Sequence, residues 1–248
     1  MATQKPVVLI TGSEGRIGSA IAANLADAYT VVGFERECKG EACIDADITA
    51  DDALAAACAT LRERYGSHIA SVIHLAAFYD FSGEPHRAYQ EVNVRGTQKL
   101  LRALQSFKVD QFIYASTMLV HAPGSPGRPI GEMAPLAPAW PYPESKLAAE
   151  RIAESERGAM PVLIMRLAGV YTDDAEVPSL ANQIQRIFER QMQSHVFPGD
   201  ATHGQAFVHL DDAVLAFRAA VDAARTCRKR RRCSLASRSP KVTRHCKI

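Results

Sequence analysis

A glycine-rich turn near the N-terminus constrains the fold of this chain more than any other feature. The apolar run at residues 5–11 predicts a buried strand, and residues 16–28 predict a helix with apolar residues at three- and four-residue spacing. Between and within them lie Gly12, Gly15 and Gly18. We expect Gly12 to permit a tight turn, Gly15 to let backbone N–H groups approach a pyrophosphate, and Gly18 to let the helix pack closely on the sheet. A strand, turn and helix with these glycines predict a dinucleotide site.

Strand-like and helix-like segments alternate along the rest of the chain. Further strands are expected at residues 30–34, 69–76, 111–116, 161–170 and 205–210. Helices are expected at 51–65, about 86–107, 178–192 and 211–224, and a Pro- and Gly-rich loop at 121–141 is expected to lead into a further helix that carries Lys146. This alternation predicts an α/β fold, a doubly wound, mainly parallel Rossmann-like sheet with helices on both faces.

Composition and charge exclude several classes of protein. Hydrophobic residues make up 47% and charged residues 23% of the 248 residues, as in ordinary globular proteins. No apolar run reaches membrane-spanning length, and the first ten residues are too short for a signal peptide, so we expect a cytoplasmic protein with no membrane contact. Residues 1–224 hold 19 of the 29 basic residues and all 27 acidic ones, a net charge of −8, which disfavours nucleic-acid binding.

The six cysteines divide between the body and the end of the chain. Cys38, Cys43 and Cys58 lie in the body, and the other three lie after residue 225. None forms a close Cys-x-x-Cys pair, so the sequence predicts reduced structural thiols, no disulfide and no metal site.

Acidic residues follow the second and third expected strands. Glu35 ends the second strand, where a carboxylate can accept hydrogen bonds from adenosine ribose and repel a 2′-phosphate, which favours NAD over NADP. Arg36 is adjacent and leaves NADP open, and an exposed strand-end acid is the alternative for Glu35. Asp47, followed by Ile48, is either a partner for adenine or a helix-capping acid.

Tyr142 and Lys146 are spaced to lie on one face of a helix, one turn apart. An ammonium near a phenol lowers the pKa of the phenol, so Tyr142 could exchange a proton near neutral pH. A hydroxyl from Thr117 or Ser116, at the end of an expected strand, could polarise the same substrate oxygen. A surface tyrosine beside a solvated lysine is the alternative.

With these motifs the chain resembles the extended short-chain dehydrogenase/reductase family, in particular its NAD-dependent epimerase/dehydratase branch. The resemblance covers about residues 5–224, in the order TGSEGRIG, HLAAF, VNVRGT, STMLVHA, YPESKLAAE, RLAGVY and FVHLDDA.

The resemblance implies a role for each matching residue. For the cofactor it implies that Gly12, Gly15, Arg16, Ile17 and Gly18 hold the pyrophosphate, Glu35 the ribose, Asp47 and Ile48 the adenine, and Leu75, Ala76 and Ala77 the nicotinamide side. Asn93 would be the family's helix-disrupting, site-supporting residue. For catalysis it implies Thr117, rather than Ser116, as the hydroxyl, Tyr142 as acid/base, and Lys146 as the residue that holds the nicotinamide ribose and lowers the pKa of Tyr142.

The implied reaction is hydride transfer between NAD and a secondary alcohol of a sugar or similar small molecule. Dehydratases of the family usually place Asp-Glu after the catalytic Thr, whereas Met118 and Leu119 follow Thr117 here, so dehydration is disfavoured. The aromatic stretch at residues 78–89 leaves a 3β-hydroxysteroid dehydrogenase-like reductase of a less polar alcohol open. A non-catalytic nucleotide sensor is the other alternative.

Residues 225–248 change composition abruptly, with ten Lys and Arg and no Asp or Glu. We expect residues 1–224 to form the NAD(P)-binding domain, with substrate-lobe elements from about 167 onward, and the basic tail to lie outside the fold. A reading-frame shift explains the tail better than a nucleic-acid or membrane arm, and it implies an incomplete C-terminal substrate lobe. A homodimer is left open.

Overall fold

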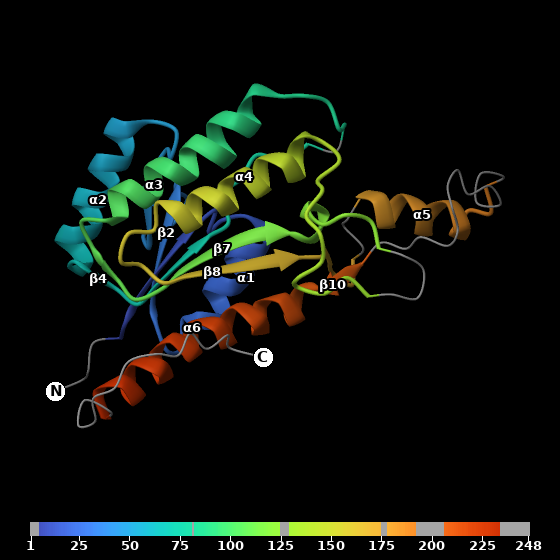
Figure 1. The fold of residues 1–248 in the computed structure, drawn as a ribbon. Helices are drawn as coiled ribbons and strands as arrows, with labels where there is room; N and C mark the ends of the chain where they lie inside the picture. The colour runs from blue at the N-terminus through green and yellow to red at the C-terminus, as the bar shows by residue number, and fades with distance from the viewer. Residues whose placement is uncertain (1–4, 81, 125–128, 175–177, 192–205, 234–248) are drawn as a thin grey trace.

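Six parallel strands form one central sheet in the order β3-β2-β1-β5-β7-β8 (Figure 1). The computed structural model describes residues 5–80, 82–124, 129–174, 178–191 and 206–233. The strands are β1 (Val7–Thr11), β2 (Thr30–Glu35), β3 (Cys43–Asp45), β5 (Ser71–His74), β7 (Phe112–Thr117) and β8 (Val162–Leu167). Strand order reverses between β1 and β5, which is where ligands bind in doubly wound sheets. The predicted Rossmann-like fold is confirmed.

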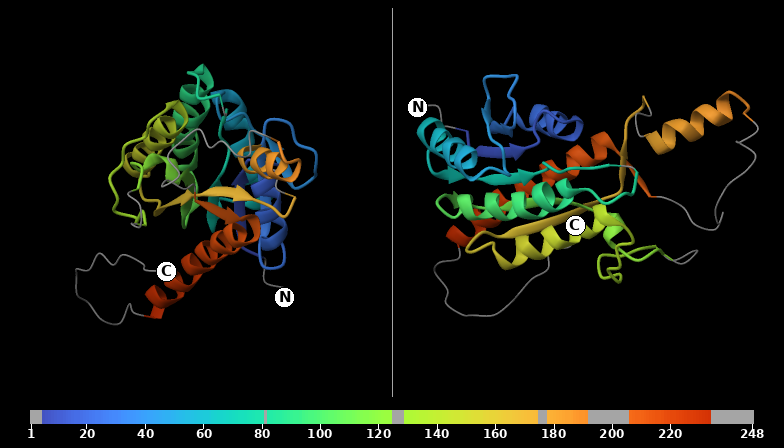
Figure 2. Two further views of the ribbon diagram at one scale, coloured as in Figure 1. Left: turned by 90° about the vertical axis from the view of Figure 1, so that its right-hand side faces the viewer. Right: turned by 90° about the horizontal axis from the view of Figure 1, so that it is seen from above.

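Helices cover both faces of the sheet (Figures 1 and 2). Their packing creates two apolar cores. One face carries α2 (Asp51–Tyr65), α3 (Thr97–Leu104) and α4 (Pro141–Ser155), and the other carries α1 (Arg16–Leu25) and α6 (Leu210–Cys233). Successive side chains of β1 point to opposite faces of the sheet, so Leu9 packs in the core on the α2 side and Ile10 packs in the core on the α1 side. A strand buried on both faces needs a continuous apolar run, as in VVLI.

The segment expected as one helix at about 86–107 has two parts. A π-helix, η1 (Tyr89–Gly96), leads into α3, and the short 3-10 helix η2 (Met118–Val120) follows β7. A π-helix adds a residue to the turn, so the apolar periodicity of the sequence does not reveal it. Two short strands, β4 (His68–Ile69) and β6 (Lys108–Val109), pair beside the sheet.

The C-terminal part supplies a separate pair of strands and a helix that covers one face of the central sheet. β9 (Gly169–Tyr171) pairs in parallel with β10 (Phe207–His209), and α5 (Pro178–Phe188) lies at the end of the molecule toward which β7 and β8 point (Figure 1). α6 instead packs on α1, where Arg218 pairs with Asp27 and the Tyr29 hydroxyl donates to Asp222. The backbone of α6 continues to Cys233, and the rest of the basic tail lies outside the described residues.

The cysteine prediction is wrong for one pair. Cys38 and Cys43 form a disulfide, with their Cα atoms 5.6 Å apart, because the chain between β2 and β3 turns back on itself. Cys58 is a buried free thiol on α2. Among the described residues, none of the helices combines the length and apolar character needed to span a bilayer.

Candidate active site

The glycine-rich turn between β1 and α1 is shaped as a cradle that side chains would fill. Gly12 has a φ of +74°, and a Cβ there would lie 3.0 Å from the backbone nitrogen of Ala76. A Cβ on Gly18 would lie 2.0 Å from the carbonyl oxygen of Gly12, so this glycine lets α1 pack on the turn itself. Gly15 is the N-cap of α1 and supplies no side-chain cap, which leaves N–H groups of the first turn to an anion. The residues present fit a bound pyrophosphate.

Arg16 and Ile17 form the first turn of α1. The Arg16 guanidinium donates to the carbonyl oxygen of Val170 on β9, at 3.4 Å. This contact brings the C-terminal unit to the edge of the glycine-rich turn.

Glu35, at the end of β2, is tied to the same turn. Its Oε1 accepts from the backbone N–H of Glu14 at 2.7 Å and from the Ser13 hydroxyl at 3.4 Å. Both hydrogen bonds end on one oxygen, and this arrangement fixes the carboxylate beside the predicted pyrophosphate site. Arg36 is exposed and adjacent.

Asp47 and Ile48 lie beyond β3. Asp47 Oδ1 accepts from the backbone N–H and the hydroxyl of Thr49, at 2.8 and 2.7 Å, and these hydrogen bonds hold the pKa of Asp47 below its usual value. The Asp47 carbonyl accepts from Ala50, the N-cap of α2. The Asp47 carboxylate therefore orders the turn before α2 and does not cap the helix, whose N-cap Ala50 has no side-chain cap; the adenine contact of Asp47 stays a prediction. Ile48 is buried beside Gly96.

A buried hydrogen-bond network anchors the loop of Leu75, Ala76 and Ala77. Thr11 Oγ1 lies 2.6 Å from His74 Nδ1 and accepts from the N–H of Ala76, and His74 Nε2 lies 2.9 Å from Thr97 Oγ1. Thr97 uses its proton on the Asn93 carbonyl, so we assign Nε2 of His74 as the protonated nitrogen. Burial lowers the pKa of His74 to about 3, and the ring stays neutral. Sequence reasoning missed His74, although its place in HLAAF was a signal.

Asn93 lies in η1 and joins three elements. Its Oδ1 accepts from the N–H of Phe78 at 2.7 Å, and its Nδ2 donates to the Phe78 carbonyl at 3.0 Å and to Ser145 Oγ at 2.9 Å. The loop after β5 and the helix that carries Tyr142 are thereby held at one position. Asn93 thus lies within the π-helix η1, as the resemblance implies for a helix-disrupting residue, and its role in supporting the site stays a prediction.

Thr117 and Ser116 end β7 but have different partners. Thr117 is the N-cap of η2 and accepts from the N–H of Leu119. The Ser116 hydroxyl donates to Glu150, a buried carboxylate on α4. Ser116 is therefore engaged in the core, which supports Thr117 as the hydroxyl at the site.

Glu150 and Arg166 form a buried ion pair behind this strand end. Arg166 Nε and Nη2 donate to the two oxygens of Glu150 at 3.0 and 2.7 Å, and the carboxylate raises the pKa of Arg166. Arg166 Nη1 also lies 3.2 Å from His121 Nε2. Because His121 Nδ1 lies 3.1 Å from the Ala134 carbonyl, this histidine has a structural role in the loop.

Tyr142 and Lys146 lie on α4, which packs on β7 and η2. Lys146 is only 3% exposed, and its Nζ lies 4.4 Å from the ring centroid of Tyr114. None of the described carboxylates forms an ion pair with it, and burial lowers its pKa to about 7. A lysine buried in this way is typical of a functional site.

The predicted effect of Lys146 on Tyr142 is wrong for this structure. Burial raises the pKa of Tyr142 well above its usual value, and Tyr79 and Tyr89 add to the increase. The rings of Tyr79, Trp140 and Tyr89 lie 4.4, 5.8 and 6.3 Å from that of Tyr142. This aromatic surrounding, which comes from distant parts of the sequence, keeps the phenol neutral.

The family model described as "NAD dependent epimerase/dehydratase family" matches residues 8–236. The chain belongs to this family. Among curated relatives of this epimerase/dehydratase chain is human dTDP-D-glucose 4,6-dehydratase, 32% identical over 154 residues, which are 59% of this chain and 42% of the relative. Short-chain dehydrogenase/reductase family 42E member 1 of Danio rerio is 29% identical over 175 residues, 64% of this chain and 43% of the relative.

A solved structure extends the similarity to the fold. UDP-glucuronic acid 4-epimerase from Bacillus cereus, in complex with UDP-glucuronic acid and NAD, matches with a TM-score of 0.68 and 26% identity, over 87% of this chain and 73% of that chain. The match to the two curated relatives named above covers less than half of the length of each.

Proposed function

We propose that this chain binds NAD along the carboxyl edge of β1, β2 and β5 and acts on a secondary alcohol of a sugar or similar small molecule. The observation that carries the proposal is the burial of Lys146 one turn from Tyr142, at a position where none of the carboxylates that the structure describes forms an ion pair with it. Burying an ammonium in this way destabilises the fold, and a structural role does not need it. Membership of the NAD-dependent family gives the second support.

The residues for the cofactor are those of the glycine-rich turn, with Glu35 for the ribose and the Leu75–Ala77 loop for the nicotinamide end. When bound, NAD accepts a hydride from the alcohol carbon or returns one to a ketone. In the reduction of a ketone, the neutral phenol of Tyr142 gives its proton to the substrate oxygen, to which Thr117 donates a hydrogen bond. In the oxidation of an alcohol, Tyr142 first releases its own proton to solvent and then takes the hydroxyl proton as a phenolate. Lys146, whose pKa is about 7, carries the positive charge that stabilises this phenolate when it is protonated. Asn93 holds the loop and α4 in place through Phe78 and Ser145.

The side chains after Thr117 favour redox or epimerisation chemistry over dehydration. Met118 and Leu119 are the first two residues of η2, and neither side chain can transfer a proton. An epimerase returns the hydride to the other face of the same intermediate, whereas a dehydrogenase releases the ketone.

The aromatic surroundings of Tyr142 favour a second candidate for the substrate. Tyr79 is 41% exposed, and its ring contacts that of Tyr142 edge-on. Together with Trp140 it provides an apolar surface for one face of a ring. A less polar ring alcohol is therefore the alternative to a nucleotide sugar.

A substrate panel with matched variants tests the proposal. The full chain and NAD are incubated with UDP- and dTDP-sugars, including UDP-glucuronic acid, and with ring alcohols, while NADH and epimeric products are measured. Tyr142→Phe should lower turnover by about 100-fold or more and keep NAD binding, whereas Tyr65→Phe on α2 should behave as wild type. NAD binding without turnover of any compound would instead favour a nucleotide sensor.

A further inference from the structure

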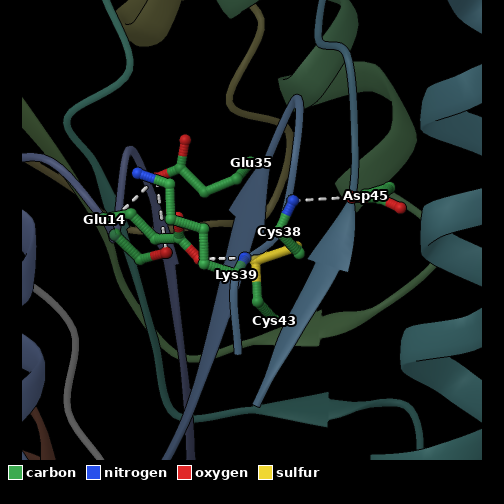
Figure 3. The surroundings of a disulfide bond; sticks show 7 residues. Glu14, Glu35, Cys38, Lys39, Cys43 and Asp45 are labelled. Carbon is green, nitrogen blue, oxygen red and sulfur yellow. Dashed lines mark hydrogen bonds between the residues drawn. A yellow bond between two sulfur atoms is a disulfide. The ribbon is translucent and has the colours of Figure 1, made fainter. Parts of the chain in front are cut away.

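The Cys38–Cys43 disulfide closes the loop between β2 and β3, directly after Glu35 (Figure 3). Both cysteines are half-buried, and residues 39–42 between them are exposed. The disulfide therefore lies in a surface loop, whereas Cys58, on α2, is buried in the core.

Two hydrogen bonds join this loop to its surroundings. The backbone N–H of Cys38 donates to Asp45 Oδ1 on β3 at 2.8 Å. The N–H of Lys39 donates to Glu14 Oε1 at 2.7 Å, and the N–H of Glu14 donates to Glu35 Oε1 at 2.7 Å (Figure 3). One residue of the glycine-rich turn thus connects the loop of the disulfide to the carboxylate predicted to bind ribose.

Packing at Gly33 makes a second connection. Gly33 pairs with Cys43 across β2 and β3. A Cβ on Gly33 would lie 2.2 Å from Ser13 Oγ and 3.5 Å from Cys43 Sγ. Cys43 and the side chain of Ser13, which itself donates to Glu35, are therefore both close to this glycine.

We propose that Cys38–Cys43 is a reversible thiol–disulfide exchange site whose oxidised form holds Glu14 and Glu35 in the arrangement that binds the adenosine end of NAD. The inference rests on the proposed NAD site. Its reaction partner is a small thiol or dithiol. A thiolate attacks one cysteine sulfur, the Cys38–Cys43 bond breaks, and the other cysteine leaves as a thiolate and takes a proton. A second external thiolate then attacks the external sulfur of the mixed disulfide and releases the first cysteine. Two electrons reduce the protein, and the external thiols become a disulfide.

Reduction removes the covalent closure of residues 38–43 but breaks no strand of the sheet. The Lys39 N–H is then no longer held against Glu14, and the turn that positions Glu35 has to be ordered by the ligand. Because ordering a loop on binding lowers affinity, we expect reduction to raise the Kd for NAD about three- to tenfold.

Calorimetric titration of NAD into the full chain tests this, before and after treatment with dithiothreitol, while alkylation and mass spectrometry report the state of each cysteine. The oxidised wild type should bind more tightly than the reduced form. The Cys38→Ser/Cys43→Ser variant should have the reduced-form affinity under both conditions. A control with Cys227, Cys233 and Cys246 changed to serine should keep the wild-type response.

Three results would overturn the inference. Equal Kd values in wild type with the disulfide intact and opened would refute the coupling while leaving the NAD site in place. Alkylation of Cys38 and Cys43 in protein kept without reductant would refute the disulfide. Absence of NAD binding in both states would defeat the proposed function as well. Circular dichroism before and after reduction separates loss of affinity from unfolding.

Discussion

The buried ion pair of Glu150 and Arg166 gives a stability prediction whose size follows from its burial. Glu150 is 3% and Arg166 22% exposed at the side chain, and two hydrogen bonds join them. Arg166→Met keeps most of the volume but leaves a buried carboxylate without its cation. Removing one partner of a buried ion pair lowers the free energy of unfolding by about 3–5 kcal/mol. Because Arg166 is partly exposed, we expect a loss at the lower end, about 3 kcal/mol. Urea unfolding at neutral pH, followed by circular dichroism, measures the loss.

A surface pair provides the matched control. Arg102 and Glu156 approach to 2.9 Å, similar to the buried pair, but Arg102 is 64% exposed. Arg102→Met should therefore cost only about 0–1 kcal/mol. If Arg166→Met proved no more destabilising than Arg102→Met, the burial argument for the Glu150 cluster behind Thr117 would be refuted.

Two further predictions concern the site itself. The pKa of Lys146 falls from 10.5 to about 7 on folding, so the unfolded chain binds more protons than the folded one between these pH values. This group therefore makes the free energy of unfolding rise with pH across that window. Between pH 7.5 and 9.5, wild type should gain up to about 2 kcal/mol relative to Lys146→Met, and an unfolding free energy with the same pH dependence in both proteins would disprove the shift. Gly12→Ala should lower stability by about 1 kcal/mol or more, because its φ is +74° and Ala76 blocks the Cβ, and it should abolish NAD binding. Gly131→Ala, in the loop before α4 where a Cβ would have no atom within 4 Å, should change neither the stability nor the NAD affinity in calorimetry, and an equal effect of both variants would contradict the steric role of Gly12.

The sequence predicts the sheet and the cofactor edge well because the determining signals are local. Each of these signals is contained in a few neighbouring residues: the apolar runs of β1 and β7, the glycines around the start of α1, and the acid at the end of β2. Their positions in the structure follow from parallel strands ending at one edge.

What the sequence did not predict arises from contacts between distant segments. The spacing of Cys38 and Cys43 gave no disulfide signal, since their proximity depends on a turn at Gly40. The pKa of Tyr142 depends first on its burial and then on Tyr79 and Tyr89, which reach it only after the loop beyond β5 and η1 have packed against α4. Spacing on one helix could not reveal either effect.

Tracing a deuterium label tests the central claim most directly. The full chain is incubated with NAD and a sugar or ring alcohol of the panel that carries deuterium on the alcohol carbon, and the cofactor is analysed by mass spectrometry after rapid quenching. If Tyr142 removes the proton while NAD takes the hydride, deuterium should appear in the reduced cofactor with wild type and be about 100-fold slower to appear with Tyr142→Phe. Conversion of the alcohol with no deuterium in the cofactor, or equal transfer by Tyr142→Phe, would contradict the proposed chemistry.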